Sequence, residues 1–191
     1  MGTKRTLDTQ TVLQAAAELA QEKGLENITL FEVAGKLGVK PPSLYNHVNG
    51  LKALSTGIAK YAMEKLEAAV RGAAVGRSKE DALKAVASAY RSFAKANPEL
   101  YKAILRFPTY DDAGVREAGH AVVRVLYQVM EPYGLSEADN LQIIRGFRSA
   151  LHGFVSLETA GFFQNAEASV DDSFDRLVSS LISTVIRKED A

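Results

Sequence analysis

Apolar residues recur three and four positions apart along most of the chain, and this spacing constrains the fold more than any other feature. It is the period of a helix with one buried face, whereas a half-buried strand alternates apolar and polar residues. Few runs of the alternating kind occur among the 191 residues. The sequence therefore predicts an all-α fold.

Glycine and proline interrupt this pattern and mark the helix ends, which gives about nine helices. The first is expected from Asp8, its N-cap, to Lys23, where a glycine follows. A second begins at Thr29, a short third at Pro42, and a long fourth covers residues 51–71. The remaining helices are expected over residues 79–96, 98–106, 112–133, 137–163 and 171–188.

One stretch near the N-terminus has the order of a helix-turn-helix: a capped helix, a glycine turn and a short proline-led helix. Thr29 and Glu32 stand at the spacing of a capping box. Ala34 is small where the two helices would cross, and Gly38 stands where the turn needs a positive φ. Leu44 would anchor the second helix.

The short helix is expected to carry a polar outer face. At 100° per residue, Leu44 and Val48 point to one side of an α-helix. The residues expected on the outer side are Pro42, Ser43 and Asn46, flanked by Tyr45 and His47. They offer hydrogen-bonding groups to base edges and include no acid that would repel phosphate. The alternative interpretation is a short surface helix with no ligand.

Charge is uneven along the chain, although 23 basic residues balance 23 acidic ones. Between Thr29 and Lys60 there are four lysines and a single acid, Glu32. A polyanion would meet this part of the chain first, the alternative being an ordinary solvated face.

The sequence TVLQAAAELAQEKGLENITLFEVAGKLGVKPPSLYNHVNGLKAL resembles the N-terminal domain of the tetracycline repressor (TetR) family of transcriptional regulators. The most specific part is Leu-Gly-Val at residues 37–39, followed by Leu44, Tyr45 and His47. The resemblance implies a DNA-binding regulator, a repressor that a small-molecule effector releases from its operator. It also implies a homodimer whose paired helices enter successive major grooves of a palindromic operator.

The resemblance, together with the polar face, assigns DNA contacts to a set of N-terminal residues. These are Thr29, Lys40, Pro42, Ser43, Tyr45, Asn46, His47 and Lys52. Two positions depart from the family pattern. Leu51 stands where many members carry a phosphate-binding lysine, and Lys52 follows one place later. Phe31 stands where some members carry a base-reading arginine; we expect it to pack within the domain, the alternative being contact with a thymine methyl.

The C-terminal part is expected to form the dimer and to bind the effector, which divides the chain into residues 1–50 and 51–191. Small residues and apolar rows on its last two helices could pack against a partner, or within one chain's core. The candidate interface residues are Gly146, Ala150, Gly153, Leu157, Leu177, Leu181 and Val185. In the family these two helices make the dimer, and a His-Gly-Phe sequence at residues 152–154 also resembles one subgroup.

The resemblance places an effector pocket between the fourth helix and the helices after it. Polar or aromatic groups within apolar rows are the candidates for its lining, the alternative being ordinary core. They are Tyr61, Phe93, Tyr101, Phe107, Tyr110, Arg148 and His152.

The sequence contains few residue patterns typical of enzymes or metal sites. The chain has no cysteine, and its three histidines form no pair at metal-binding spacing. Glu117 and His120 give one copy of the di-iron half-motif, which needs two copies. We therefore expect no enzyme, metal or cofactor. The rival hypotheses are a ligand-binding or metal-dependent oxidase bundle with a helix-turn-helix-like corner, and an adaptor that binds proteins through residues 41–50.

The N-terminal sequence has no apolar run typical of a secretory signal, and no stretch approaches the ~18 apolar residues of a membrane span. The sequence therefore predicts a soluble, cytoplasmic protein.

Overall fold

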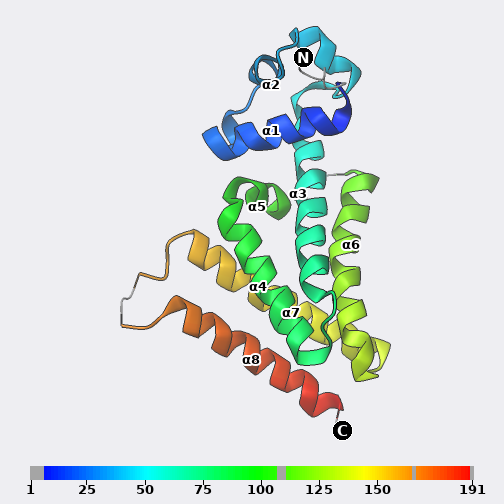
Figure 1. The fold of residues 1–191 in the computed structure, drawn as a ribbon, viewed down its shortest axis with the longest axis vertical. Helices are drawn as coiled ribbons and strands as arrows, with labels where there is room; N and C mark the ends of the chain where they lie inside the picture. The colour runs from blue at the N-terminus through cyan, green and yellow to red at the C-terminus, as the bar shows by residue number, and fades with distance from the viewer. Residues whose placement is uncertain (1–6, 107–110, 165–166, 190–191) are drawn as a thin grey trace. The chain divides into compact units, whose positions relative to one another are not determined.

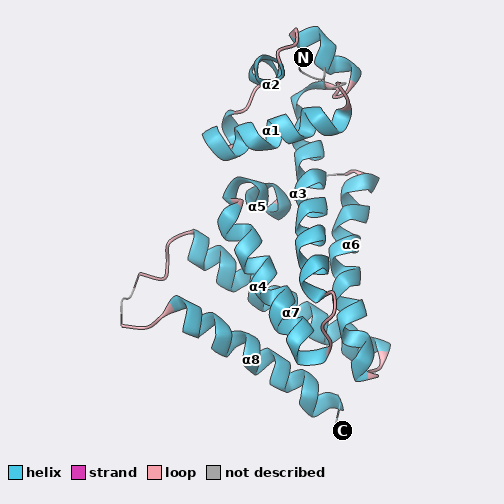
Figure 2. Ribbon diagram, viewed as in Figure 1, coloured by secondary structure: helices cyan, strands magenta, loops and turns pink. Residues whose placement is uncertain are grey.

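A computed structural model describes residues 7–106, 111–164 and 167–189. All regular structure in these residues is helical, which confirms the all-α prediction (Figures 1 and 2). The elements in chain order are α1 (Thr9–Lys23), η1 (Leu25–Asn27), α2 (Leu30–Leu37), η2 (Pro41–Asn46), α3 (Gly50–Ala74), α4 (Lys79–Ala96), α5 (Pro98–Leu105), α6 (Ala113–Met130), η4 (Glu131–Tyr133), α7 (Glu137–Thr159) and α8 (Val170–Glu189).

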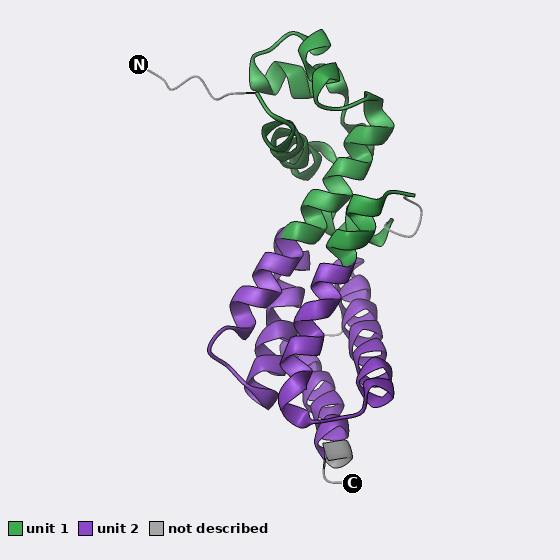
Figure 3. Ribbon diagram, turned by 90° about the vertical axis from the view of Figure 1, so that its right-hand side faces the viewer, with its two compact units in different colours: residues 1–64, 97–119 green, residues 65–96, 120–191 purple. Residues whose placement is uncertain are grey.

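The chain forms two compact units (Figure 3). Unit 1 contains residues 1–64 and 97–119, and unit 2 contains residues 65–96 and 120–191. Both α3 and α6 begin in unit 1 and end in unit 2. The predicted domain boundary after residue 50 falls at the start of α3, and it stays a prediction.

Local capping explains where the first two α-helices begin. The Asp8 carboxylate accepts a 2.7 Å hydrogen bond from the backbone N–H of Thr11 at the start of α1. Thr29 and Glu32 form the predicted capping box at the start of α2. Gly38 ends α2 with φ of 66°, a left-handed conformation that glycine adopts without steric cost.

The proline-led helix differs from the predicted one in position and type. It is a 3-10 helix that begins at Pro41, one residue earlier than expected, with Lys40 as its N-cap. The Ser43 N–H donates to the Lys40 carbonyl oxygen at 2.9 Å, the three-residue spacing of a 3-10 turn. Pro41 itself fits the first helical position, since its missing N–H is not needed there.

Unit 2 is built around the apolar faces of its helices, and α7 ends earlier than predicted. The helix stops at Thr159 rather than at residue 163, and Gly161 follows with φ of 78°. The buried face of α7 consists of Ile144, Phe147, Leu151 and Val155.

Arg91 on α4 joins α4, α7 and α8 within unit 2. Its guanidinium donates two hydrogen bonds to Glu158 on α7, at 2.7 and 2.6 Å, and pairs with Asp171 on α8 at 2.7 Å. It also lies 4.7 Å from the ring centroid of Phe174 and 5.7 Å from that of Phe154. The planar guanidinium group allows both kinds of contact, because it donates parallel hydrogen bonds to a carboxylate and stacks on aromatic rings.

Candidate nucleic-acid interface

Salt bridges in unit 1 link α2 to α1 on one flank of α2. Lys23 pairs with Glu32 at 2.6 Å, and Lys36 pairs with Glu22 at 2.8 Å and with Glu18 at 3.4 Å. These side chains are between 27 and 56% exposed, so water weakens each pair and each adds little stability. The burial of Val33 and Ala34, the core residues of α2, supplies the larger stabilising contribution.

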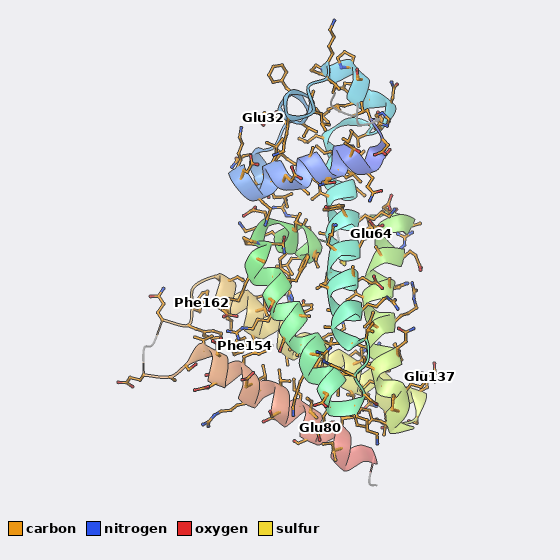
Figure 4. The ribbon with its side chains drawn as sticks, viewed as in Figure 1. Glu32, Glu64, Glu80, Glu137, Phe154 and Phe162 are labelled. Atoms are coloured by element: carbon orange, nitrogen blue, oxygen red, sulfur yellow. The ribbon has the colours of Figure 1, made fainter. Side chains whose placement is uncertain are left out.

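Glu32, the single acid between Thr29 and Lys60, is labelled in Figure 4. Its carboxylate accepts hydrogen bonds from Lys23 Nζ at 2.6 Å and from the Thr29 hydroxyl at 2.9 Å. Hydrogen bonds from Lys23 and Thr29 keep the pKa of the Glu32 carboxyl below its usual range. Glu32 is therefore ionised at neutral pH and paired with the Lys23 cation. The Lys23 cation partly neutralises the charge of Glu32, so this carboxylate repels a polyanion near residues 29–60 less strongly.

The 3-10 geometry of η2 accounts for the exposure of the side chains on two of its three sides. At three residues per turn, Pro41 and His47 share the side of Leu44, which is 0% exposed. Both are accordingly half-buried. Pro42 and Tyr45 share another side and are exposed, Tyr45 to 58%. The predicted outer face is therefore narrower than an α-helical period would make it.

The structure brings all the predicted DNA-contacting residues into unit 1. Thr29, Lys40, Pro42, Tyr45, Asn46 and Lys52 are exposed, whereas Ser43 and His47 are half-buried. Lys52 lies in the first turn of α3, directly after Leu51, whose side chain is also exposed. Six of the eight candidate side chains are thus exposed at the surface of one unit.

Phe31 overturns an expectation. We expected it to pack within the domain, but its side chain is 76% exposed on the first turn of α2. Val33 and Ala34 already fill the buried face of this short helix, so Phe31 falls outside it.

Hydrogen bonds that the sequence does not predict attach α5 to the first helices of unit 1. The Gln21 side-chain oxygen accepts hydrogen bonds from the backbone N–H groups of Glu99 and Leu100, at 2.8 and 3.3 Å. In return, the Glu99 carboxylate accepts one from the Leu25 N–H at 2.7 Å. Gln21 thus serves the unsatisfied N–H groups at the start of α5. No local sequence signal indicates a partner 78 positions away.

The predicted effector contacts do not gather within one unit. Tyr61 and Tyr101 belong to unit 1, and Phe93, Arg148 and His152 to unit 2. Tyr101 and Phe93 are buried, Tyr61 is half-buried, and Arg148 and His152 are exposed. Phe107 and Tyr110 lie outside the described residues.

Unit 2 contains a cavity of about 210 Å³ that none of the candidate residues lines. Its walls come from the end of α3, the start of α4 and the end of α6, with Arg71, Arg77, Ser78 and Gln128 as the polar members. Drug-sized ligands usually occupy pockets of about 300–1,000 Å³. This cavity is smaller than such a pocket.

The candidate dimer residues fall into two groups. On α7, Gly146, Gly153 and Leu157 are exposed, and a Cβ added at either glycine would meet no atom within 4 Å. Ala150 on α7, and Leu177 and Leu181 on α8, are half-buried. Val185, by contrast, is 1% exposed and belongs to the core of unit 2.

Metal clusters and membrane-spanning helices are both absent from the described ranges. No cluster of three or more His, Asp or Glu side chains suited to a metal ion occurs in residues 7–106, 111–164 and 167–189. None of the helices described there combines the length and the apolar character needed to cross a membrane.

Comparison with known proteins identifies both parts of the chain. Residues 12–47 match the family model described as bacterial regulatory proteins, tetR family. Residues 83–181 match the model of the tetracyclin repressor-like C-terminal domain. The first match covers α2 and η2 entirely, and the second runs from α4 into α8.

Relatives and solved structures agree with these matches. An HTH-type transcriptional regulator of Mycobacterium tuberculosis is 30% identical over 183 residues, which is 95% of this chain and 83% of the relative. The HTH-type regulator YobS of Bacillus subtilis is 33% identical over 161 residues, 84% of each chain. A variant of TetR from Acinetobacter baumannii AYE, solved in complex with minocycline, has the same fold, with a TM-score of 0.70, 21% identity and coverage of 95% and 98%. The chain therefore belongs to the tetR family of bacterial regulatory proteins and is a transcriptional regulator of the helix-turn-helix type.

Proposed function

We propose that the protein is a homodimeric repressor that binds a palindromic operator through η2 and is released from it by a small molecule. The DNA contacts would come from Thr29, Lys40, Pro42, Ser43, Tyr45, Asn46, His47 and Lys52. In this arrangement η2 enters the major groove, and the first turn of α3 contributes Lys52 to the phosphates.

The observation that carries the proposal is the division of η2 between an anchored side and a free side. Leu44 and Val48 are 0% and 5% exposed and hold the helix on unit 1. Pro42, Tyr45 and Asn46 remain exposed, and no acid lies among them. One side of this short helix packs on unit 1, and the other side exposes uncharged side chains. The polar ones among these side chains can form hydrogen bonds with base edges in a DNA groove.

The dimer is proposed to form through α7 and α8. The exposed stripe of Gly146, Gly153 and Leu157 would let a second copy's helix approach closely, because the two glycines present bare backbone. Ala150, Leu177 and Leu181 would become further buried there. A twofold axis would then set the spacing of two DNA half-sites at about one helical turn, ~34 Å.

Release by an effector is proposed because a protein of the same fold, TetR from Acinetobacter baumannii, is known in complex with minocycline. The protein would have one conformation that fits DNA and another that does not. The effector must bind the second conformation more tightly than the first, since only a difference in affinity shifts an equilibrium. The effector contacts stay predictions. They are Tyr61, Phe93, Tyr101, Phe107, Tyr110, Arg148 and His152.

Selection of DNA from a random-sequence pool by the full-length protein tests the proposal. We expect enrichment of an inverted repeat and a complex of two chains per duplex, because each η2 reads one half-site. A Gly153→Arg variant should fail to dimerise and should bind the repeat far more weakly. It should keep its fold, because a Cβ added at Gly153 meets no atom within 4 Å. Sedimentation velocity measures the first effect and a band-shift titration the second.

The matched control is Gly72→Arg on α3, where an added Cβ also meets no atom within 4 Å. This variant should dimerise and bind DNA like the wild type. Enrichment of no sequence at all would contradict the proposed operator. A dimeric Gly153→Arg variant would remove Gly153 from the interface.

A further inference from the structure

We infer that Phe31 is a specificity-determining residue that contacts a thymine methyl group in the operator. The inference rests on the proposed function, in that it takes unit 1 to bind operator DNA. It goes further by assigning a base contact to α2, outside η2, and by naming the chemical group that is read.

The exposure of Phe31 is the first observation. At 76%, it is the largest exposed fraction among the large apolar side chains in the described residues. A phenyl ring left in water forgoes the stabilisation that burial would give it. Phe31 is not among the buried residues of α2, which are Val33 and Ala34.

The flank of α2 that carries Phe31 is the second observation. Glu32 and Lys36 use another flank to pair with α1. At 100° per residue, Phe31 and Gly35 lie together on a flank apart from both α1 and the buried face. A Cβ added at Gly35 would meet no atom within 4 Å. The ring therefore stands beside open space with room for a partner.

The surroundings favour DNA as that partner. Thr29 begins the same helix and is exposed, and the residues from Thr29 to Lys60 carry four lysines. The single acid, Glu32, is paired with Lys23. In a helix-turn-helix the first of the two helices crosses the DNA backbone, next to the groove that the second helix enters. Phe31 would thus be carried to the edge of the major groove.

The chemistry of the ring selects the group that it can read. A phenyl side chain has no hydrogen-bonding group, so it cannot distinguish bases by their donors and acceptors. The C5-methyl of thymine is the apolar group that bases present in the major groove, and apolar contacts to it discriminate thymine from cytosine and purines. Phe31 should therefore require thymine at one position of each half-site.

Deoxyuridine provides the test, since it pairs as thymidine does but lacks the methyl group. In the duplex selected by the wild-type protein, each thymidine of one half-site is replaced in turn by deoxyuridine. At one position, the wild-type protein should lose about four-fold in affinity, the value for burying one methyl-sized group. Phe31→Ala should bind the unmodified duplex at least four-fold more weakly and show no further loss at that position. Fluorescence anisotropy titrations measure both effects.

Two matched variants sharpen the result. Phe31→Leu keeps an apolar contact and should retain part of the preference for thymidine. Val75→Ala removes an apolar side chain of similar exposure, 71%, from unit 2 and should bind every duplex like the wild type.

The outcomes separate this inference from the proposed function. If a duplex is selected but Phe31→Ala binds it with wild-type affinity, or loses as much as the wild type at every deoxyuridine, the role of Phe31 is wrong while the repressor stands. A protein partner for Phe31 would give that same result. If no duplex is selected, the proposed function fails, and this inference fails with it.

Discussion

Replacing Tyr45 by alanine is expected to weaken operator binding by about 10- to 100-fold and to leave the fold and the dimer intact. Tyr45 lies on the free side of η2 and is 58% exposed, while Leu44 and Val48 anchor the helix independently. A well-formed contact to a base is worth about 1–3 kcal/mol, which corresponds to this range. Band-shift titrations on the selected duplex measure the loss, and thermal unfolding measures the stability.

Tyr45→Phe is the matched control, because it removes the hydroxyl group and keeps the ring. A loss shared by both variants would assign the contact to the hydroxyl, and a loss confined to Tyr45→Ala would assign it to the ring. Wild-type affinity of Tyr45→Ala would show that η2 does not read the operator through its exposed side.

Replacing Glu158 by glutamine is expected to lower the free energy of unfolding by about 2–3 kcal/mol at pH 7. The side chains of Glu158 and Arg91 are each 11% exposed, so the substitution leaves a largely buried guanidinium with a weaker partner. Hydrogen bonding to Arg91 holds the pKa of the Glu158 carboxyl below its ordinary value of 4.5. Urea unfolding at a series of pH values measures the difference.

The pH dependence follows from the direction of that shift. A lowered folded-state pKa stabilises the protein above the unfolded-state value, and this stabilisation is lost as the pH falls through the folded-state pKa. The difference in the free energy of unfolding between wild type and Glu158→Gln should therefore be largest at pH 7. It should shrink as the pH falls below about 4.5. Glu80→Gln, which breaks the exposed Lys84–Glu80 pair of the same unit, should cost under about 0.5 kcal/mol. A gap that stays constant with pH would exclude ionised Glu158 as its source.

The parts of the fold that follow from neighbouring residues could be predicted from the sequence. Asp8 and Thr29 cap helices by accepting hydrogen bonds from backbone N–H groups three positions later in the chain. Gly38 ends α2 because glycine readily adopts the left-handed conformation found there. Such interactions leave a local pattern in the sequence. The all-α architecture follows in the same way from the spacing of apolar residues.

The features that sequence analysis missed depend on residues far apart in the chain. Gln21 and Glu99 are 78 positions apart, and Arg91 and Glu158 are 67 positions apart. Neither pair has a motif that indicates it. The exposure of Phe31 was missed for a related reason, because an aromatic residue in a short helix is buried only if the core has space on that flank.

The helical type of η2 also could not be predicted, although its start was predicted to within one residue and Leu44 was predicted as its anchor. An α-helical period placed Ser43 on the outer face and His47 beside it, whereas both side chains are half-buried. The 3-10 period accounts for His47, which shares the side of buried Leu44. The predicted DNA surface stays a prediction, and fewer of its side chains are exposed than an α-helical period would expose. Tyr45, Pro42 and Asn46 are its most accessible members on η2.

Affinity for the selected duplex and for a scrambled duplex of the same composition, measured across a range of salt concentrations, tests the central claim most directly. Affinity for both should fall as salt rises, because lysine contacts to phosphates release counterions. The selected duplex should be preferred by about a thousand-fold or more, because base contacts add to the phosphate contacts. Equal affinity for the two duplexes at every salt concentration would contradict a sequence-specific operator-binding protein.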